Sequence, residues 1–239
     1  MNALAVKGLC KRYPAFSLEN VSFSVPEGAV MGFIGRNGAG KSTTLKSILG
    51  LVHPDAGEVT VLGKSFREEE QYIKEHIGVV LGGIDFYPKK KVRLLSDVTR
   101  RFYGNWQEEK YRHYLNLFGI DQEKRVDQLS TGMRVKYMIA LALSHDARLL
   151  ILDEPTSGLD PVSRDELTEL LRRIAADGQR SVLFSTHITF IKDGTIQHTG
   201  TLTDFQQHYA YLRQPGQELT LEDIIVSVER RPLDENAIV

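Results

Sequence analysis

The sequence predicts an α/β fold with a mostly parallel sheet, an antiparallel β side sheet and an inserted α-helical subdomain. Three observations support this prediction. Short apolar runs of strand length alternate with helical patterns, as is typical of parallel sheets. Alternating apolar and polar residues near the N-terminus, as in Val21–Val25, indicate half-buried antiparallel strands. Between about Leu94 and His145, strand patterns give way to helical spacing.

The composition is that of a globular protein with enough apolar residues for a large core. The chain has 239 residues, of which 41% are hydrophobic and 26% charged, and its formal net charge is −1. This near-neutral charge gives no reason to expect nucleic acid as a partner. The single cysteine, Cys10, allows no intramolecular disulfide, which favours a reducing compartment. Without a signal-peptide pattern or a long apolar run, we expect a cytoplasmic protein.

The individual elements follow from apolar periodicity and from the residues that interrupt it. One helix is predicted from Lys41 to Leu51, because Pro54 prevents its continuation, and another spans Pro161–Ala176. Apolar residues at helical spacing, such as Tyr111 and Leu115, characterise the inserted subdomain. The predicted strands are Leu4–Leu9, Leu18–Val25, Ala29–Ile34, Gly57–Leu62, Ile77–Leu81, Leu149–Leu152, Ser181–Ser185 and Thr189–Ile191.

We interpret residues 1–239 as a single domain with an insertion. The core is expected at about 1–83 and 148–205, because strand patterns occur only there. The helical subdomain is expected at about 84–147, and a short C-terminal extension at about 206–239.

A glycine-rich segment between a predicted strand and a predicted helix indicates a phosphate-binding loop. Residues 35–42, GRNGAGKS, fit the pattern G-x-x-x-x-G-K-[ST], which predicts a P-loop NTPase core. Its backbone amides would bind phosphate oxygens, Lys41 would reach the β- and γ-phosphates of ATP, and Ser42 would coordinate Mg²⁺. A chance match in a chain of this length has a probability on the order of one per cent. The predicted nucleotide-binding residues here are Gly35, Asn37, Gly38, Gly40, Lys41, Ser42 and Thr43.

Two adjacent carboxylates follow the apolar run at 149–152, at the strand end where α/β sheets bind ligands. We expect Asp153 to coordinate Mg²⁺ and Glu154 to act as the general base toward the attacking water. The alternative is an acidic pair that caps a helix before Pro155. His187 follows the next strand and could reach the γ-phosphate, although a single histidine is more often structural. The predicted catalytic residues are therefore Glu154, His187 and Lys41.

In this order, the motifs resemble the ATP-binding cassette (ABC) family over essentially the whole chain. The most specific segment is Leu129–Met133, LSTGM, which is similar to the family's LSGGQ signature. The resemblance implies that Ser130 and Gly132 bind ATP held by a second subunit, at a helix N-terminus. Ser130 could equally be an ordinary N-cap, and both roles are compatible.

Two further segments match the family. Tyr13 lies where the family places an aromatic residue that stacks on adenine, the alternative being a core tyrosine. Residues 157–160, SGLD, resemble the D-loop, which crosses the dimer interface, so the resemblance adds Asp160 to the nucleotide site.

The resemblance implies an ATP-binding and hydrolysing subunit of a transporter, driven by ATP-dependent dimer closure. Its implied partners are a second ABC subunit, identical or paralogous, and a transmembrane permease on the inner face of the cell membrane. Residues 102–106 and 130–133 look like those of bacterial bacitracin-type exporters, which favours export. Two alternatives remain open: a catalytically weak regulatory cassette of a heterodimer, and a soluble ABC ATPase without a transport role.

The sequence departs from the family pattern in three places. Thr131 and Met133 replace a glycine and a glutamine of the signature, which we expect to alter affinity without abolishing it. Gly82 stands where the family has the Q-loop glutamine, so coupling to a permease is affected more than hydrolysis. After His187, two predicted strands follow each other too closely for a parallel crossover, which needs about a dozen residues. We therefore hypothesise that about ten residues are missing from the numbering near Ile188–Thr189.

Overall fold

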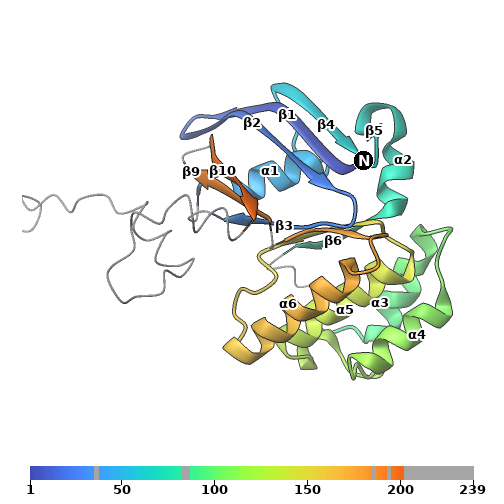
Figure 1. Ribbon diagram of the computed structural model, residues 1–239. Coiled ribbons are helices and arrows are strands. Elements are labelled where there is room, and N and C mark those ends of the chain that lie inside the picture. The colour runs from blue at the N-terminus through green and yellow to red at the C-terminus, as the bar shows by residue number, and fades with distance from the viewer. Residues whose placement is uncertain (35–37, 82–86, 185–186, 193–194, 202–239) are drawn as a thin grey trace, which may run out of the picture.

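Two β-sheets form the framework of the fold, with helix α1 between them (Figure 1). The structure, a computed structural model, describes residues 1–34, 38–81, 87–184, 187–192 and 195–201. The strands are β1 (Asn2–Tyr13), β2 (Phe16–Pro26), β3 (Val30–Ile34), β4 (Ala56–Val61), β5 (Lys64–Ser65), β6 (Ile77–Leu81), β7 (Leu149–Asp153), β8 (Ser181–Leu183), β9 (His187–Lys192) and β10 (Thr195–Thr201). The helices are α1 (Lys41–Ile48), α2 (Phe66–His76), α3 (Val92–Thr99), η1 (Arg100–Phe102), α4 (Glu108–Leu117), η2 (Val126–Gln128), α5 (Thr131–Ser144) and α6 (Pro161–Ala175).

The larger sheet is mostly parallel, which confirms the predicted α/β class. Its strand order is β10-β9-β3-β8-β7-β6, and only the pairing of β10 with β9 is antiparallel. The smaller sheet, in the order β2-β1-β4-β5, is antiparallel throughout, as the alternating pattern near the N-terminus predicted. None of the helices in the described ranges combines the length and the apolar character that crossing a bilayer requires.

Strand β7 shows how the larger sheet separates two hydrophobic clusters. Leu149 and Ile151 pack in the cluster that α1 and the antiparallel sheet share, whereas Leu150 and Leu152 pack in the cluster formed with α5 and α6. Successive side chains of a strand point to opposite faces, so each face of β7 has its own helical partner. By the same alternation, Asp153 at the end of the strand belongs to the face of α1.

The helices between β6 and β7 have a cluster of their own, although they are not independent of the sheet. Tyr111 of α4 and Tyr137 of α5 belong to this third cluster, while Ile139 and Leu143 of α5 pack against the sheet. Helix α5 is therefore shared by both cores. The inserted helical region is confirmed as part of the fold. Its exact bounds remain a prediction, as does the extension at about 206–239, which lies outside the described residues.

Helix α2 was not predicted, because few of its residues are apolar, although those few lie on one face. Only Ile73 of this helix is buried, and three consecutive glutamates begin at Glu68. A helix that is polar on most of its surface lacks the wide apolar stripe by which helices are recognised in a sequence. Its start is nevertheless encoded locally, because Ser65 accepts a hydrogen bond from the backbone N–H of Arg67 and caps the helix.

The hypothesis of a missing segment near Ile188–Thr189 stays a prediction. Ile188 and Thr189 are consecutive residues of β9, and their pairing with β3 has no break in register. A long crossover is needed only when the second strand starts beside the beginning of the first. Here β8 pairs with Val30 and Met31 on one side of β3. Strand β9 pairs with β3 on its other side, from Met31 onward. Strands β8 and β9 therefore lie one after the other along the two sides of β3.

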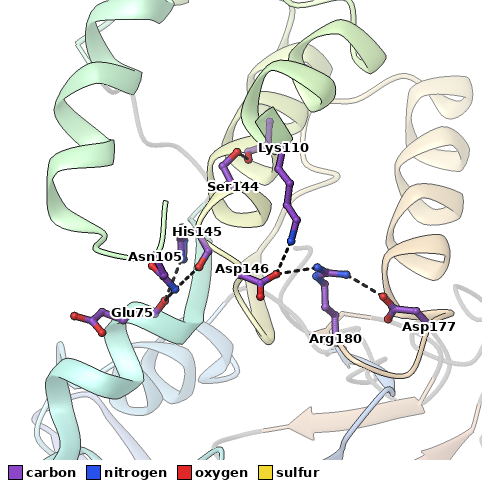
Figure 2. A network of polar contacts seen from close by, with 9 residues as sticks. Glu75, Asn105, Lys110, Ser144, His145, Asp146, Asp177 and Arg180 are labelled. Carbon is purple, nitrogen blue, oxygen red and sulfur yellow. Dashed lines mark hydrogen bonds and ion pairs between the residues drawn. The ribbon is translucent and has the colours of Figure 1, made fainter. Parts of the chain in front are cut away.

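A polar network connects the end of α5 to three other parts of the chain (Figure 2). The side-chain N–H₂ of Asn105 donates to the backbone carbonyls of His145, at 2.6 Å, and Glu75, at 3.3 Å. The His145 ring stacks on Tyr103 with 3.7 Å between centroids, and its Nδ1 lies 3.2 Å from the Glu75 carbonyl oxygen. These contacts attach the segment before α4 to both α2 and α5.

The second half of the network is centred on the Asp146 carboxylate. It accepts from Lys110 Nζ at 3.0 Å and from the Arg180 guanidinium at 3.1 Å, and Arg180 also pairs with Asp177 at 2.9 Å. The hydrogen bond from Lys110, more than that from Arg180, lowers the pKa of Asp146. This ion-pair chain joins α4 to the loop before β8, which follows α6.

Acid is expected to destabilise the protein through His145. Burial lowers the pKa of this histidine to about 4 from its ordinary value of 6.5. Below pH 6.5 the unfolded chain therefore binds a proton that the folded chain does not. The free energy of unfolding should fall by about 3 kcal/mol between pH 6.5 and 4 from this group alone. Urea denaturation at several pH values should show that His145→Phe loses this pH-dependent part of the free energy of unfolding. The exposed control His113→Gln should retain it. An unchanged pH slope in His145→Phe would contradict this account.

Adding a methyl group to Gly78 is expected to destabilise the sheet. A Cβ at this position would clash with Ala142 and would lie 2.5 Å from Leu150 Cδ2. Gly78→Ala should therefore lower the free energy of unfolding by about 1–3 kcal/mol, the usual range for overpacking. In the control Gly104→Ala, the Cβ meets no atom within 4 Å, so chemical denaturation should show little change. Equal effects of the two substitutions would show that the packing at Gly78 is not tight.

Candidate functional site

Ser42 and Asp153, the two predicted metal ligands, lie next to each other. Ser42 is the second residue of α1, Asp153 ends β7, and the Ser42 hydroxyl donates to Asp153 Oδ1 at 3.4 Å. The contact follows from the alternation in β7, which turns Asp153 toward α1. A hydroxyl and a carboxylate are ligands that suit Mg²⁺, which completes its octahedron with water and phosphate oxygens. The residues present therefore fit a magnesium ion.

The segment before α1 depends on glycine at position 40. Gly40 has a φ of +107°, and a Cβ there would lie 2.5 Å from Leu18 Cδ2 and 2.8 Å from Phe16 Cζ. Both its backbone conformation and its close approach to β2 therefore require glycine. Gly40 is also the N-cap of α1 and offers no side chain to the first helical amides. An anion is favoured at such a helix start, where no acidic residue occupies the first turn.

A cavity of about 410 Å³ opens beside this helix start, and we call it the loop cavity. Its volume lies within the range typical of small-molecule sites. The sequence analysis had singled out most of its residues, with Phe16 the exception. Its lining is Phe16, Gly38, Gly40, Lys41, Ser42, Thr43 and Glu154.

A second cavity, of about 390 Å³, lies beyond the wall that Lys41 and Glu154 form, and we call it the rear cavity. Lys41 and Glu154 line both cavities, whereas Asp153 lines only the rear one. Glu154 has a φ of +48°, a conformation that is uncommon for residues other than glycine. Strain of this kind is concentrated at functional sites, because surrounding structure must maintain it. The structure thus brings together the predicted phosphate-binding lysine and the predicted base.

Tyr13 lies at the surface, where β1 ends. Its side chain is 42% exposed, Lys11 Nζ lies 5.8 Å from its ring centroid, and its strand partner is Phe16. This exposure excludes the alternative of a core tyrosine. Phe16 lines the loop cavity, and Tyr13 is its partner on the neighbouring strand. Tyr13 therefore lies beside a residue of the cavity wall, a position that is compatible with stacking on a nucleotide base. The stacking itself stays a prediction.

Ser130, Gly132 and Asp160 do not line either cavity. Ser130 is the N-cap of α5 and accepts from the backbone N–H of Met133 at 3.2 Å, which confirms the capping alternative. Asp160 caps α6 and accepts from the backbone N–H of Ser163 at 3.0 Å and from its hydroxyl at 2.6 Å. These hydrogen bonds lower the pKa of Asp160. Within one chain, Ser130 and Asp160 cap helices and Gly132 lines neither cavity, so the nucleotide-binding role of these three residues stays a prediction.

Three predicted site residues lie wholly or partly outside the described residues. Gly35 and Asn37 lie outside the described residues, as does the side chain of His187. His187 is the first residue of β9, and its Cα is paired with the Cα of Met31 in β3. The predicted role of His187 at the γ-phosphate stays a prediction.

Sequence reasoning missed several residues that line the cavities, among them Phe16 and Arg164. Phe16 gives no pattern beyond that of an ordinary strand residue, and only the fold brings it against Gly40. Arg164 of α6 lines the rear cavity and could have been noticed. It follows Pro161 by three residues, in the first turn of a helix, where a positive side chain opposes the helix dipole.

Comparison with known proteins identifies the family. The family model described as "ABC transporter" matches residues 18–157. A bacitracin transport ATP-binding protein, BcrA of Bacillus licheniformis, is 32% identical over 188 residues, covering 78% of this chain and 61% of that protein. A Nod factor export ATP-binding protein I of Burkholderia orbicola is 36% identical over 183 residues, covering 74% of this chain and 60% of its own length. The chain thus spans about three fifths of the length of these curated relatives.

The solved structures agree with this family. One described as the ATP-binding subunit of an ABC transporter has a TM-score of 0.80 and 26% identity, covering 95% of this chain and 100% of that chain. It confirms the predicted P-loop NTPase core. The family model matches more than half of the sequence, including the phosphate loop and the signature segment. The chain therefore belongs to the ABC transporter family.

Proposed function

We propose that the chain binds ATP with Mg²⁺ and hydrolyses it to power an ABC transporter. The observation that carries this proposal is the 3.4 Å contact between Ser42 and Asp153, beside a loop cavity whose wall contains Lys41 and Glu154. A hydroxyl, two carboxylates and a lysine next to a helix N-terminus match the needs of a triphosphate and a divalent cation. Binding by a triphosphate alone would not require a carboxylate at the position of Glu154.

Each residue has a distinct part in the proposed hydrolysis. The backbone of the phosphate loop and Lys41 hold the β- and γ-phosphates, and Ser42 and Asp153 hold Mg²⁺. When bound, Mg²⁺ neutralises charge on the phosphate oxygens. Glu154 accepts a proton from the attacking water, whose oxygen bonds to the γ-phosphorus while the bond to the bridging oxygen breaks. The products are ADP, inorganic phosphate and a proton retained on Glu154.

We propose further that a second cassette completes the ATP-binding site, with Ser130 and Gly132 of the partner contacting the nucleotide. These residues lie at the start of α5 and line neither cavity of their own chain. A Cβ on Gly132 would have no neighbour closer than Leu159 Cδ2 at 3.7 Å, so internal packing does not require glycine there. Free space at an exposed helix N-terminus supports close approach by an anionic ligand from outside the chain. Thr131 and Met133 would then weaken this contact without removing its donors.

The transport role is supported by the relatives. Those named for bacitracin transport and Nod factor export favour an exporter, with a permease as membrane partner on the inner face of the cell membrane. Whether the second cassette is identical or paralogous does not follow from one chain. Gly82, which replaces the Q-loop glutamine, lies outside the described residues. Its missing side chain would weaken communication with the permease more than hydrolysis.

A regulatory cassette is the second candidate, and the substituted signature residues Thr131 and Met133 favour it. Such a subunit would bind ATP but hydrolyse it very slowly. A soluble ABC ATPase without a transport role is a weaker candidate, because the net charge of −1 offers no attraction to nucleic acid. Single-turnover hydrolysis by the purified chain separates an active cassette from a regulatory one.

Glu154→Gln is expected to retain ATP binding and to lose hydrolysis. The amide preserves the shape of the side chain but cannot accept the proton, so single-turnover rates should fall by about 10²–10⁴-fold. ATP-bound protein should then accumulate as a dimer, measurable by size-exclusion chromatography with light scattering. Glu169→Gln, an exposed change on α6 that removes only the pair with Arg173, should hydrolyse ATP like the unmodified chain. Unimpaired hydrolysis by Glu154→Gln would rule out this residue as the base.

A further inference from the structure

Positive charge is concentrated in residues 87–102, which lead into the inserted helices and which we call the basic segment. The segment has six cationic residues and one anionic residue, Asp97, so its formal charge is +5. The chain as a whole has a formal net charge of −1. The positive charge is therefore a local property of this part of the surface. The cations are Lys89, Lys90, Lys91, Arg93, Arg100 and Arg101.

Neighbouring carboxylates neutralise only part of this charge. Glu123 pairs with Lys91 at 2.7 Å and with Arg93 at 3.1 Å, and Asp97 pairs with Arg100 at 3.4 Å. The cations that are exposed and form no ion pair within the described part of the chain are Lys89, Lys90 and Arg101. These three remain available to an external anion.

Helix α3, within the basic segment, turns large apolar side chains outward. Leu94 and Val98 are each 46% exposed, and their spacing of four residues places them on one face of the helix. Val92 and Ser96 are buried on the other face. The helix is therefore attached to the fold by one side and presents an apolar stripe on the other.

Two aromatic side chains extend this apolar surface at the ends of the basic segment. Tyr87 is 67% exposed and Phe102 is 76% exposed. Both line the same cavity, of about 460 Å³, as Val98, so the three side chains lie together. Exposed apolar residues and cations without ion pairs thus occur side by side in the basic segment.

This combination fits a membrane surface better than a protein interface. The buried cores of protein interfaces are depleted of lysine. Helices that lie at the bilayer boundary instead combine Lys and Arg with Leu and aromatic residues, and basic clusters on such helices attract anionic headgroups.

We propose that the basic segment binds the surface of a membrane that contains anionic phospholipids. Lys89, Lys90 and Arg101 contact the headgroup phosphates, while the apolar side chains enter the boundary between headgroups and acyl chains. The apolar side chains are Tyr87, Leu94, Val98 and Phe102. This binding requires no nucleotide, so it is independent of the proposed ATP hydrolysis.

The test is co-flotation of the purified chain, without nucleotide, with vesicles of phosphatidylcholine alone or of equal parts phosphatidylcholine and phosphatidylglycerol. The unmodified chain should bind only the anionic vesicles, and added salt should release it by screening the headgroup charge. Replacing both Lys89 and Lys90 by Gln should lower the partition coefficient about fivefold for each lysine removed. Replacing both Arg172 and Arg173 by Gln, which removes the same charge from an exposed part of α6, should leave binding unchanged.

Phe102→Ser tests the apolar contribution, because it leaves the charge unchanged. Its partition coefficient on anionic vesicles should fall by about tenfold, since the removed ring no longer leaves water on binding. Binding equal to that of the unmodified chain would overturn the proposal, and so would an equal loss in the α6 control, which would indicate unspecific charge attraction. If the unmodified chain does not bind anionic vesicles, the proposal fails and a protein partner remains the occupant of this surface. Urea denaturation of each variant verifies its folding, and ATP affinity measured on the same samples tests the proposed function separately.

Discussion

The candidate site depends on the direction in which one side chain leaves the end of β7. Leu149 and Ile151 anchor the α1 face of this strand, and the alternation places Asp153 on the same face, 3.4 Å from the Ser42 hydroxyl. A shift of the strand by one residue would turn the carboxylate toward α5 and α6. The apolar residues of β7 therefore determine, through their packing on both faces, whether a magnesium site can exist at all.

The antiparallel sheet is one reason why residue 40, at the start of α1, must be glycine. Phe16 and Leu18 of β2 fill the space that a side chain on residue 40 would occupy. The side sheet thus packs against the start of α1, besides covering one face of the parallel sheet. On the opposite side, α5 links the sheet to the inserted helices, because its residues belong to both clusters.

Much of this arrangement could be predicted from the sequence, because its signals are local. The apolar run at 149–152 and the glycines around Lys41 specify a strand and a loop without reference to distant residues. Contacts between distant segments were harder to predict. Phe16 at the loop cavity and Arg164 at the rear cavity gain their roles only when β2 and α6 pack in place.

The expectation of a missing segment depends on a related property of the fold. The spacing between Ser181–Ser185 and Thr189–Ile191 is too short for a crossover between strands that start at the same level. The sequence does not show that β8 and β9 flank β3 and follow each other along it. Strand order is a property of the assembled sheet. Helix α2 was likewise missed because most of its surface is polar. The Ser65 cap and the packing of the helix against the rest of the fold stabilise it.

The most direct test of the central claim is calorimetric titration of ATP into the purified chain with and without Mg²⁺, compared with Lys41→Ala. The account predicts that the unmodified chain binds ATP, that omission of Mg²⁺ weakens this binding by about tenfold or more, and that Lys41→Ala abolishes it through loss of the cation nearest the phosphates. Binding that is independent of both Mg²⁺ and Lys41, or no binding at all, would contradict the assignment of the site.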